Sequence, residues 1–159
     1  MIKYFVNQVN PIGANCYVVY DTESKNCLII DLGGDFYKIK RQIDDLNLCV
    51  KGVLLTHGHF DHVMGVSECK KFGFPIYISR ADSQMLSSNT NMAKAFGFGD
   101  FSCTADEILV EGKTEVGGIE IEVIKTKLIQ KEGETRKVPV NIPNSNYINT
   151  IKVKSQGSL

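Results

Sequence analysis

All three histidines of this 159-residue chain lie within six positions of one another. They are His57, His59 and His62, and Asp61 lies directly before the last of them, so that the segment reads Thr-His-Gly-His-Phe-Asp-His. Imidazole nitrogen and carboxylate oxygen are ligands that zinc prefers at roughly 2.0 to 2.2 Å, and the ligands of one ion must converge on a point. The clustering of these side chains therefore predicts a metal-binding loop.

The spacing within this loop suits two metal positions. Gly58 supplies the backbone freedom for a sharp turn. His57 and His59 can reach one ion together, while Asp61 and His62 project toward a second position, as in two-metal hydrolytic sites. The alternative interpretation is a solvated loop with coincidental histidines, or an aspartate that only caps a helix starting near His62. Because the chain has no other histidine, we favour the metal site.

The elements expected around the loop form an α/β layer with buried parallel strands. Apolar runs predict strands at residues 2–9, 16–20, 27–31, 51–56 and 75–79, and alternation predicts another strand at 117–125. Helical periodicity runs through Phe36, Ile39, Ile43 and Leu46, and a second helix is expected from His62 to Phe72. Residues 82–100 are expected to form a helix and a long loop that cap a cleft. The histidines thus follow a buried strand directly.

Residues 56–62 resemble the Thr-His-x-His-x-Asp-His signature of the metallo-β-lactamase superfamily. Segments 10–17 and 28–35 are similar to the first strands of its glyoxalase II-like, or hydroxyacylglutathione hydrolase-like, members, and the likeness covers about residues 1–126. The resemblance implies the αββα sandwich of that family. We expect residues 1–126 to form the N-terminal half of this domain and residues 127–159 to form an atypical basic tail.

The resemblance also implies roles for individual residues. His57 and His59 would bind the first metal, Asp61 and His62 the second, and Asp31 at the end of an early strand would buttress the metal loop from behind. A turn carboxylate at a strand end, without a role in metal binding, is the alternative for Asp31. The expected cofactor is zinc, as one or two ions, although histidine and carboxylate ligands also suit iron.

The implied reaction is the hydrolysis of a thioester or related acyl bond in a small-molecule substrate. A bound metal lowers the pKa of water from about 15.7 to about 7, and the resulting hydroxide attacks the acyl carbon. Asp61 would orient that hydroxide and shuttle its proton, which makes it the strongest catalytic candidate. Two alternatives are an iron-containing oxygen or sulfur enzyme of the same fold, and a non-catalytic remnant that binds metal weakly.

The family pattern breaks after Thr126. The family continues with Pro-Gly-His-Thr, whereas this chain continues with Lys-Leu-Ile-Gln, and the later aspartate and histidine ligands are also missing. Residues 125–159 hold seven basic and two acidic side chains, whereas residues 1–124 hold eleven and sixteen. We therefore expect that the reading frame was shifted or spliced near Thr126, or that the domain is truncated there. The frameshift requires that Pro-Gly-His-Thr be encoded in another frame, whereas a truncation does not. A tail that is a loose strand pair or disordered, a missing second sheet, low metal affinity and poor solubility would follow.

Composition excludes several classes of function. The eighteen basic and eighteen acidic residues balance, and no Lys- and Arg-rich cluster is interleaved with aromatic residues, so we expect no nucleic-acid partner. No apolar run approaches the roughly 20 residues of a membrane span, and the start has no signal-peptide pattern, so we expect a cytoplasmic protein. Five scattered cysteines predict reduced, mostly buried thiols rather than disulfides.

Overall fold

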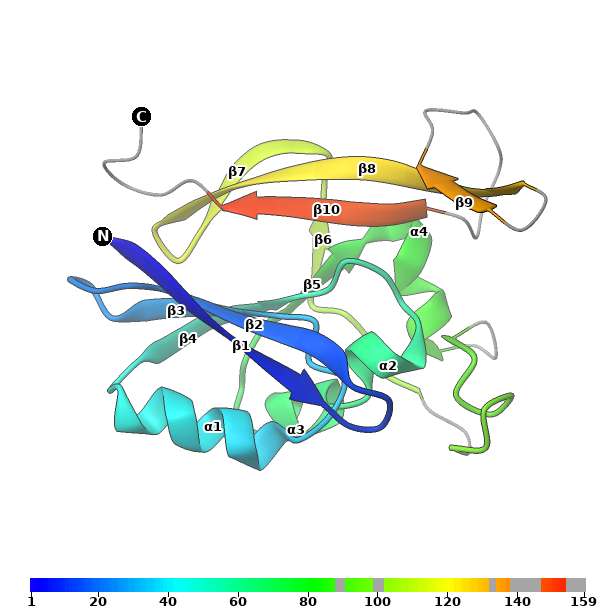
Figure 1. Ribbon diagram of the computed structural model, residues 1–159. Helices are drawn as coiled ribbons and strands as arrows, with labels where there is room; N and C mark the ends of the chain where they lie inside the picture. Colours follow the sequence, from blue (N-terminus) through cyan, green and yellow to red (C-terminus); the bar gives the residue numbers. More distant parts are fainter. Residues whose placement is uncertain (88–90, 99–101, 132–133, 138–146, 154–159) are drawn as a thin grey trace.

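Two stacked β-sheets form the body of the molecule in the computed structural model, which describes residues 1–87, 91–98, 102–131, 134–137 and 147–153 (Figure 1). The strands are β1 (Ile2–Val9), β2 (Ala14–Asp21), β3 (Asn26–Ile30), β4 (Cys49–Leu54), β5 (Ile76–Ser79), β6 (Glu107–Leu109), β7 (Gly112–Val116), β8 (Ile119–Lys131), β9 (Glu134–Lys137) and β10 (Tyr147–Val153). The helices are α1 (Phe36–Asp45), α2 (Phe60–Val63), α3 (Val66–Lys71), α4 (Arg80–Ser83) and the 3₁₀ turn η1 (Met85–Ser87). This α/β architecture is the predicted fold class.

The first sheet has the order β1-β2-β3-β4-β5-β6. Strands β1, β2 and β3 pair antiparallel, whereas β3, β4, β5 and β6 run parallel. Parallel neighbours end at the same edge of a sheet, so the residues that follow β3 and β4 lie side by side. The amide of Asp31, just after β3, donates to the carbonyl of Leu54 at the end of β4 over 3.0 Å. This register places Asp31 beside the histidine loop.

Alternating side chains of the first sheet enter two separate cores. On one face Ile29 and Val53 pack with Ile39 and Ile43 of α1 and with Val66 of α3. The opposite face meets the second sheet, where the buried residues are Val19, Leu28, Ile30, Leu54, Leu109, Val116, Ile119, Ile121 and Val123. Figure 1 shows the same arrangement, with α1 and α3 below the first sheet and β7, β8 and β10 above it.

The expectation of a missing second sheet is wrong. Strands β7, β8 and β10 pair antiparallel in the order β10-β8-β7, and β9 pairs with the far end of β8. Strand β8 continues past Thr126, and the strand-pair alternative for the tail holds over β8 to β10. Strands β6 and β7 were not expected. Strand β7 is short and mostly exposed, and its sequence Gly-Lys-Thr-Glu-Val has no alternation of apolar residues that would predict a strand.

The helix expected at 62–72 is divided into α2 and α3. The break lies at Gly65, whose amide donates to the carbonyl of Leu32 over 2.9 Å. A Cβ atom at Gly65 would lie 2.9 Å from the Leu32 side chain, so the backbone approaches too closely for a continuous helix with larger residues. The helix of the expected cap is reduced to α4 and η1, and residues 88–90 and 99–101 lie outside the described part.

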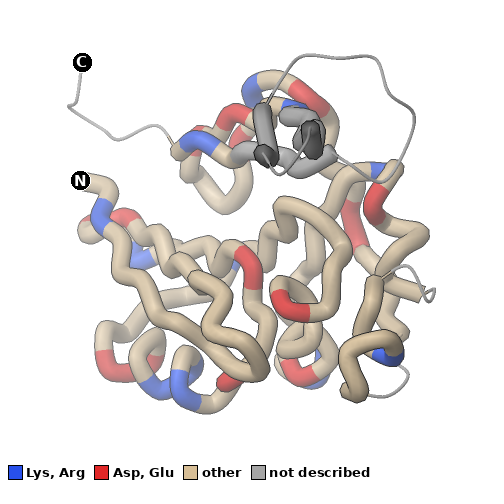
Figure 2. The backbone as a smooth tube through the Cα atoms, turned by 45° about the vertical axis from the view of Figure 1, so that its right-hand side comes forward, with Lys and Arg blue, Asp and Glu red and all other residues tan. Residues whose placement is uncertain are grey.

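Other expectations concern thiols, charge and membranes. All five cysteines are free, and four of them are buried, with Cys49 as the exposed one, which confirms the prediction. Basic and acidic positions are interspersed over both layers of the described chain (Figure 2). Within the described ranges, no helix has the length and apolar character needed to cross a bilayer.

Candidate metal centre

The three histidine rings gather at the edge of the first sheet where β3 and β4 end. The ring centroids of His57 and His62 are 4.3 Å apart, and those of His57 and His59 are 4.9 Å apart. His57 is 7% exposed, because it lies directly behind the end of β4, while His59 and His62 are half-buried at the start of α2. The loop therefore brings together the imidazoles that the sequence predicted as a group.

Asp31 holds this loop from the neighbouring strand. Its Oδ1 accepts the Thr56 amide over 2.8 Å, and its Oδ2 accepts the Thr56 hydroxyl over 2.6 Å. The same Oδ2 lies 3.0 Å from Nδ1 of His62. Asp31 is 6% exposed and has a φ of 60°, in the left-handed region that residues other than glycine seldom occupy. The contacts of Asp31 with the loop, and not contacts with solvent, therefore hold it in this conformation.

The same network determines which ring nitrogens are available. The single hydroxyl proton of Thr56 is donated to Asp31, so Thr56 Oγ1 accepts from Nδ1 of His57 across their 3.0 Å separation. The Nδ1 atom of His62 donates to Asp31 in the same way. These tautomers are assigned from the hydrogen bonds. Nε2 is then the remaining nitrogen of both rings, and in His62 it lies 3.3 Å from Oδ2 of Asp61. Metal-binding histidines are oriented in the same way by a carboxylate or hydroxyl at their other nitrogen.

Carboxylates on both sides of His62 favour a cation at this place. Burial lowers the pKa of His57 to about 4, and neighbouring His62 acts in the same direction. Burial also lowers the pKa of His62, but hydrogen bonds to Asp31 and to Asp61, whose Oδ2 lies 3.3 Å from Nε2, outweigh it and raise the pKa to about 10. The site thus stabilises the imidazolium of His62 between two carboxylates. A divalent cation bound by these groups would take the place of that proton.

The donor atoms of Asp31, His57 and His62 all lie within 4.8 Å of one another, a spacing that can hold a metal ion. Both oxygens of Asp31 already accept hydrogen bonds, so the two imidazoles are the freer donors. His59 and Asp61 border this group without belonging to it. These three residues offer imidazole nitrogen and carboxylate oxygen at one edge of the first sheet, and both kinds of ligand suit a zinc or iron ion.

Sequence reasoning gave no role to two residues that contact the loop. Thr56 connects Asp31 to His57, and its signal was its place at the start of the signature. Asp82 of α4 lies close to Gly58 and His59, and its only sequence signal was the Ser-x-x-Asp spacing from Ser79 that is typical of a helix start. Neither contact could be derived from spacing along the chain.

Gly33 provides a test of how tightly the loop is packed. A Cβ atom at Gly33 would overlap the carbonyl oxygen of Asp61. We expect Gly33→Ala to lower the free energy of unfolding by about 1–3 kcal/mol and to weaken Co²⁺ binding, because the metal loop must move. Urea denaturation and cobalt titration measure the two effects. Lys71→Ala, at an exposed position on α3, is the control, and equal effects in both variants would contradict the prediction.

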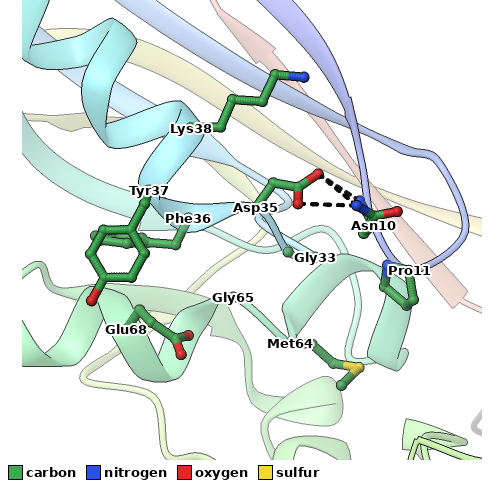
Figure 3. Close-up of a pocket in the computed structure, with 11 residues that line it drawn as sticks. Asn10, Pro11, Gly33, Asp35, Phe36, Tyr37, Lys38, Met64, Gly65 and Glu68 are labelled. Carbon is green, nitrogen blue, oxygen red and sulfur yellow. Dashed lines mark hydrogen bonds between the residues drawn. The ribbon is translucent and has the colours of Figure 1, made fainter.

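A cavity of about 530 Å³ lies beside the metal loop, across the Gly33–Gly34 turn (Figure 3). Its lining residues are Asn10, Pro11, Gly33, Gly34, Asp35, Phe36, Tyr37, Lys38, Met64, Gly65 and Glu68. Asp35 turns toward Asn10, accepting its backbone amide over 3.0 Å and its side-chain amide over 3.2 Å. The described histidines are not part of this lining, so the cavity and the metal centre are separate features.

The sequence is similar to one protein family and to several known proteins. Residues 9–132 match the family described as the Metallo-beta-lactamase superfamily. The chain is 34% identical over 121 residues to an uncharacterized protein of Aquifex aeolicus, covering 74% of this chain and 56% of that protein. It is 30% identical over 122 residues to the probable metallo-hydrolase YqgX of Bacillus subtilis, covering 74% and 57%. It is 40% identical over 85 residues to the hydroxyacylglutathione hydrolase GloC of Haemophilus influenzae, covering 52% and 40%.

Solved structures with this fold include two that are each 26% identical to the chain. The BLEG-1 B3 metallo-beta-lactamase superimposes with a TM-score of 0.70 at 26% identity, covering 77% of this chain and 60% of that one. TTHA1623 in a di-iron-bound form superimposes with a TM-score of 0.63 at 26% identity, covering 74% and 59%. The chain thus spans a little more than half the length of the first curated relatives and about three-fifths of these structures.

Proposed function

Because this chain belongs to the metallo-β-lactamase superfamily, whose members are metal-dependent hydrolases, we propose that it hydrolyses a thioester or related acyl bond in a small molecule. The observation that carries the proposal is the convergence of Asp31, His57 and His62 on one point at the end of two parallel strands. The likeness to a hydroxyacylglutathione hydrolase supports a thioester as substrate.

The residues around the site take separate roles in this proposal. His57 and His62 would bind the ion, with His59 and Asp61 completing its surroundings, and Asp31 would orient both imidazoles through the hydrogen bonds already described. When bound, zinc or iron supplies a Lewis acid that lowers the pKa of water and polarises the acyl carbonyl. Asp61, at the rim beside His62, would orient the attacking water and accept its proton.

Two other functions remain as specific alternatives. A relative of the same fold has been solved in a di-iron-bound form, which favours an iron-containing oxygen or sulfur enzyme as the second candidate. The Lys-Leu-Ile-Gln sequence that follows Thr126 in place of the family's Pro-Gly-His-Thr favours the third, a non-catalytic remnant that binds metal weakly. Metal analysis of the purified chain separates zinc from iron, and turnover separates an enzyme from a remnant.

The decisive experiment measures thiol release from a hydroxyacyl thioester of glutathione. Chain loaded with Zn²⁺ or Fe²⁺ is expected to hydrolyse the thioester above the rate of the same chain treated with chelator, and added metal should restore the rate. A β-lactam serves as a comparison substrate, because one structural neighbour is a metallo-beta-lactamase. Folded, metal-loaded protein that releases no thiol would instead support the remnant.

A further inference from the structure

A second buried carboxylate, that of Asp82, lies close to the metal loop. Asp82 is 6% exposed and belongs to the first turn of α4. Its Oδ2 accepts the hydroxyl of Ser79 over 2.7 Å, and its amide donates to Ser79 Oγ over 3.3 Å. These two bonds cap the helix. A capping aspartate need not be buried, however, so the cap alone does not account for the position of this side chain.

The carboxylate of Asp82 also reaches the metal loop. The backbone amide of Gly58, between His57 and His59, lies near this carboxylate and acts to lower the pKa of Asp82. Gly58 rests directly on α4 and η1, because a Cβ atom there would lie 2.6 Å from Cβ of Met85 and 3.0 Å from the carbonyl oxygen of Asp82. The turn between the two histidines is therefore seated on this segment, with no room for a side chain between them.

Charges near Asp82 match a role at the metal centre. Burial raises the pKa of its carboxyl group, while the hydrogen bond from Ser79 and the nearby side chains of His59 and Lys125 act in the opposite direction. A buried carboxylate is costly unless hydrogen bonds and opposite charges compensate it. Here the compensation comes from the helix start, from the metal loop and from the second sheet. Asp82 thus connects all three at the rim of the site.

We propose that Asp82 is a positioning residue for the metal centre, whose carboxylate fixes the Gly58 amide and so sets the directions in which His57 and His59 present their rings. The inference rests on the proposed function only in taking these histidines as metal ligands. Asp31 secures the loop at Thr56 and Asp82 secures it at Gly58, one residue on each side of His57. Two carboxylates from different elements then hold the loop against rotation.

Three variants test this role with Co²⁺ as the probe. Asp82→Leu removes the acceptor and is expected to lower Co²⁺ affinity by about 10–100-fold, as loss of such an orienting partner does. Asp82→Asn keeps one carbonyl oxygen for Gly58, so its affinity should stay within about threefold of wild type. The matched control is Asp106→Leu, which removes a carboxylate that accepts the Ile76 amide over 2.9 Å at the opposite end of β5. Visible absorption of bound Co²⁺ reports affinity and geometry.

A second measurement is independent of metal. In the metal-free wild type, the Gly58 amide is expected to exchange with solvent more slowly than the amide of an unstructured glycine, and Asp82→Leu should remove that protection. An unprotected Gly58 amide in the wild type overturns the proposal even if Asp82→Leu does not fold. The proposal is also overturned if Asp82→Leu leaves the Co²⁺ affinity unchanged. The same holds if Asp106→Leu lowers the affinity as much as Asp82→Leu does, or if Asp82→Asn does. Protection of Gly58 in a chain that binds no Co²⁺ would instead contradict the proposed metal site and support only the contact between Asp82 and Gly58.

Discussion

The chain with His57→Ala and His59→Ala is expected to retain less than about one tenth of the zinc or iron that the wild type holds after identical purification. Loss of an orienting partner alone costs roughly 10–100-fold in metal affinity, and this variant removes two imidazoles from the loop itself. The remaining donors, Asp31, Asp61 and His62, already satisfy one another through hydrogen bonds. Elemental analysis of both proteins at equal concentration gives the comparison.

A matched control separates the loss of ligands from loss of fold. His57 is buried, so its replacement leaves a small cavity, and circular dichroism should show that the variant retains its sheets. Lys71→Ala, at an exposed position on α3, provides a variant of the same chain in which the metal content should equal that of the wild type. If the double variant binds as much metal as this control, the histidine cluster is not the metal centre.

The first half of the fold could be predicted because its elements carry strong local patterns. Strands β3 and β4 are apolar and β-branched, and α1 repeats apolar residues at helical spacing, so burial follows from the sequence itself. Strands β6 and β7 could not be predicted in this way. They are short and largely exposed, and what stabilises them is pairing with β5 and β8, which is a property of tertiary structure. The division of α2 from α3 depends in the same way on the approach of Gly65 to Leu32.

The candidate site divides along the same line. The clustering of the histidines is visible in the sequence, because all of them belong to one loop. Asp31 could be suggested from its place at a strand end, but its contacts follow from the register of β3 against β4. The sequence did not indicate a function for Asp82, because its contact with Gly58 depends on where α4 lies after the end of β5. The metal-binding side chains could thus be predicted from the sequence, whereas the residues that position them could be identified only from the order and register of the strands.

The second sheet changes what can be expected of the chain in solution. The inner face of the first sheet was expected to be open, but Leu28 and Leu54 are fully buried against Ile119 and Ile121 of β8. Burial of aliphatic side chains stabilises a fold by about 1.5–3 kcal/mol each. The structural reason for expecting poor solubility is therefore removed over this part of the sheet. The strands after Thr126 contribute to this cover, since Ile151 and Val153 of β10 pack against the same core.

Asp61→Asn is expected to lower kcat for thioester hydrolysis by about 10²–10⁴-fold while the metal content stays close to that of the wild type. Asparagine keeps the size of the side chain and one carbonyl oxygen, but it cannot accept a proton from water. Burial raises the pKa of Asp61, but the adjacent His62 outweighs this effect and the pKa is lowered overall, so the carboxylate is ionised at neutral pH in the wild type. Steady-state kinetics on metal-loaded protein should show the loss in kcat rather than in KM.

The control for this variant is Asp45→Asn, an exposed carboxylate at the end of α1, for which kcat should not change. A proportional loss of metal and of activity in Asp61→Asn would assign Asp61 to metal binding alone and would contradict its role as proton acceptor. Unchanged turnover would remove it from the mechanism altogether. The distinction follows from position, because Asp61 lies 3.3 Å from His62 at the rim of the loop but outside the group of donors that converge on one point. A carboxylate placed beside the ligands rather than among them can accept a proton from water through its second oxygen.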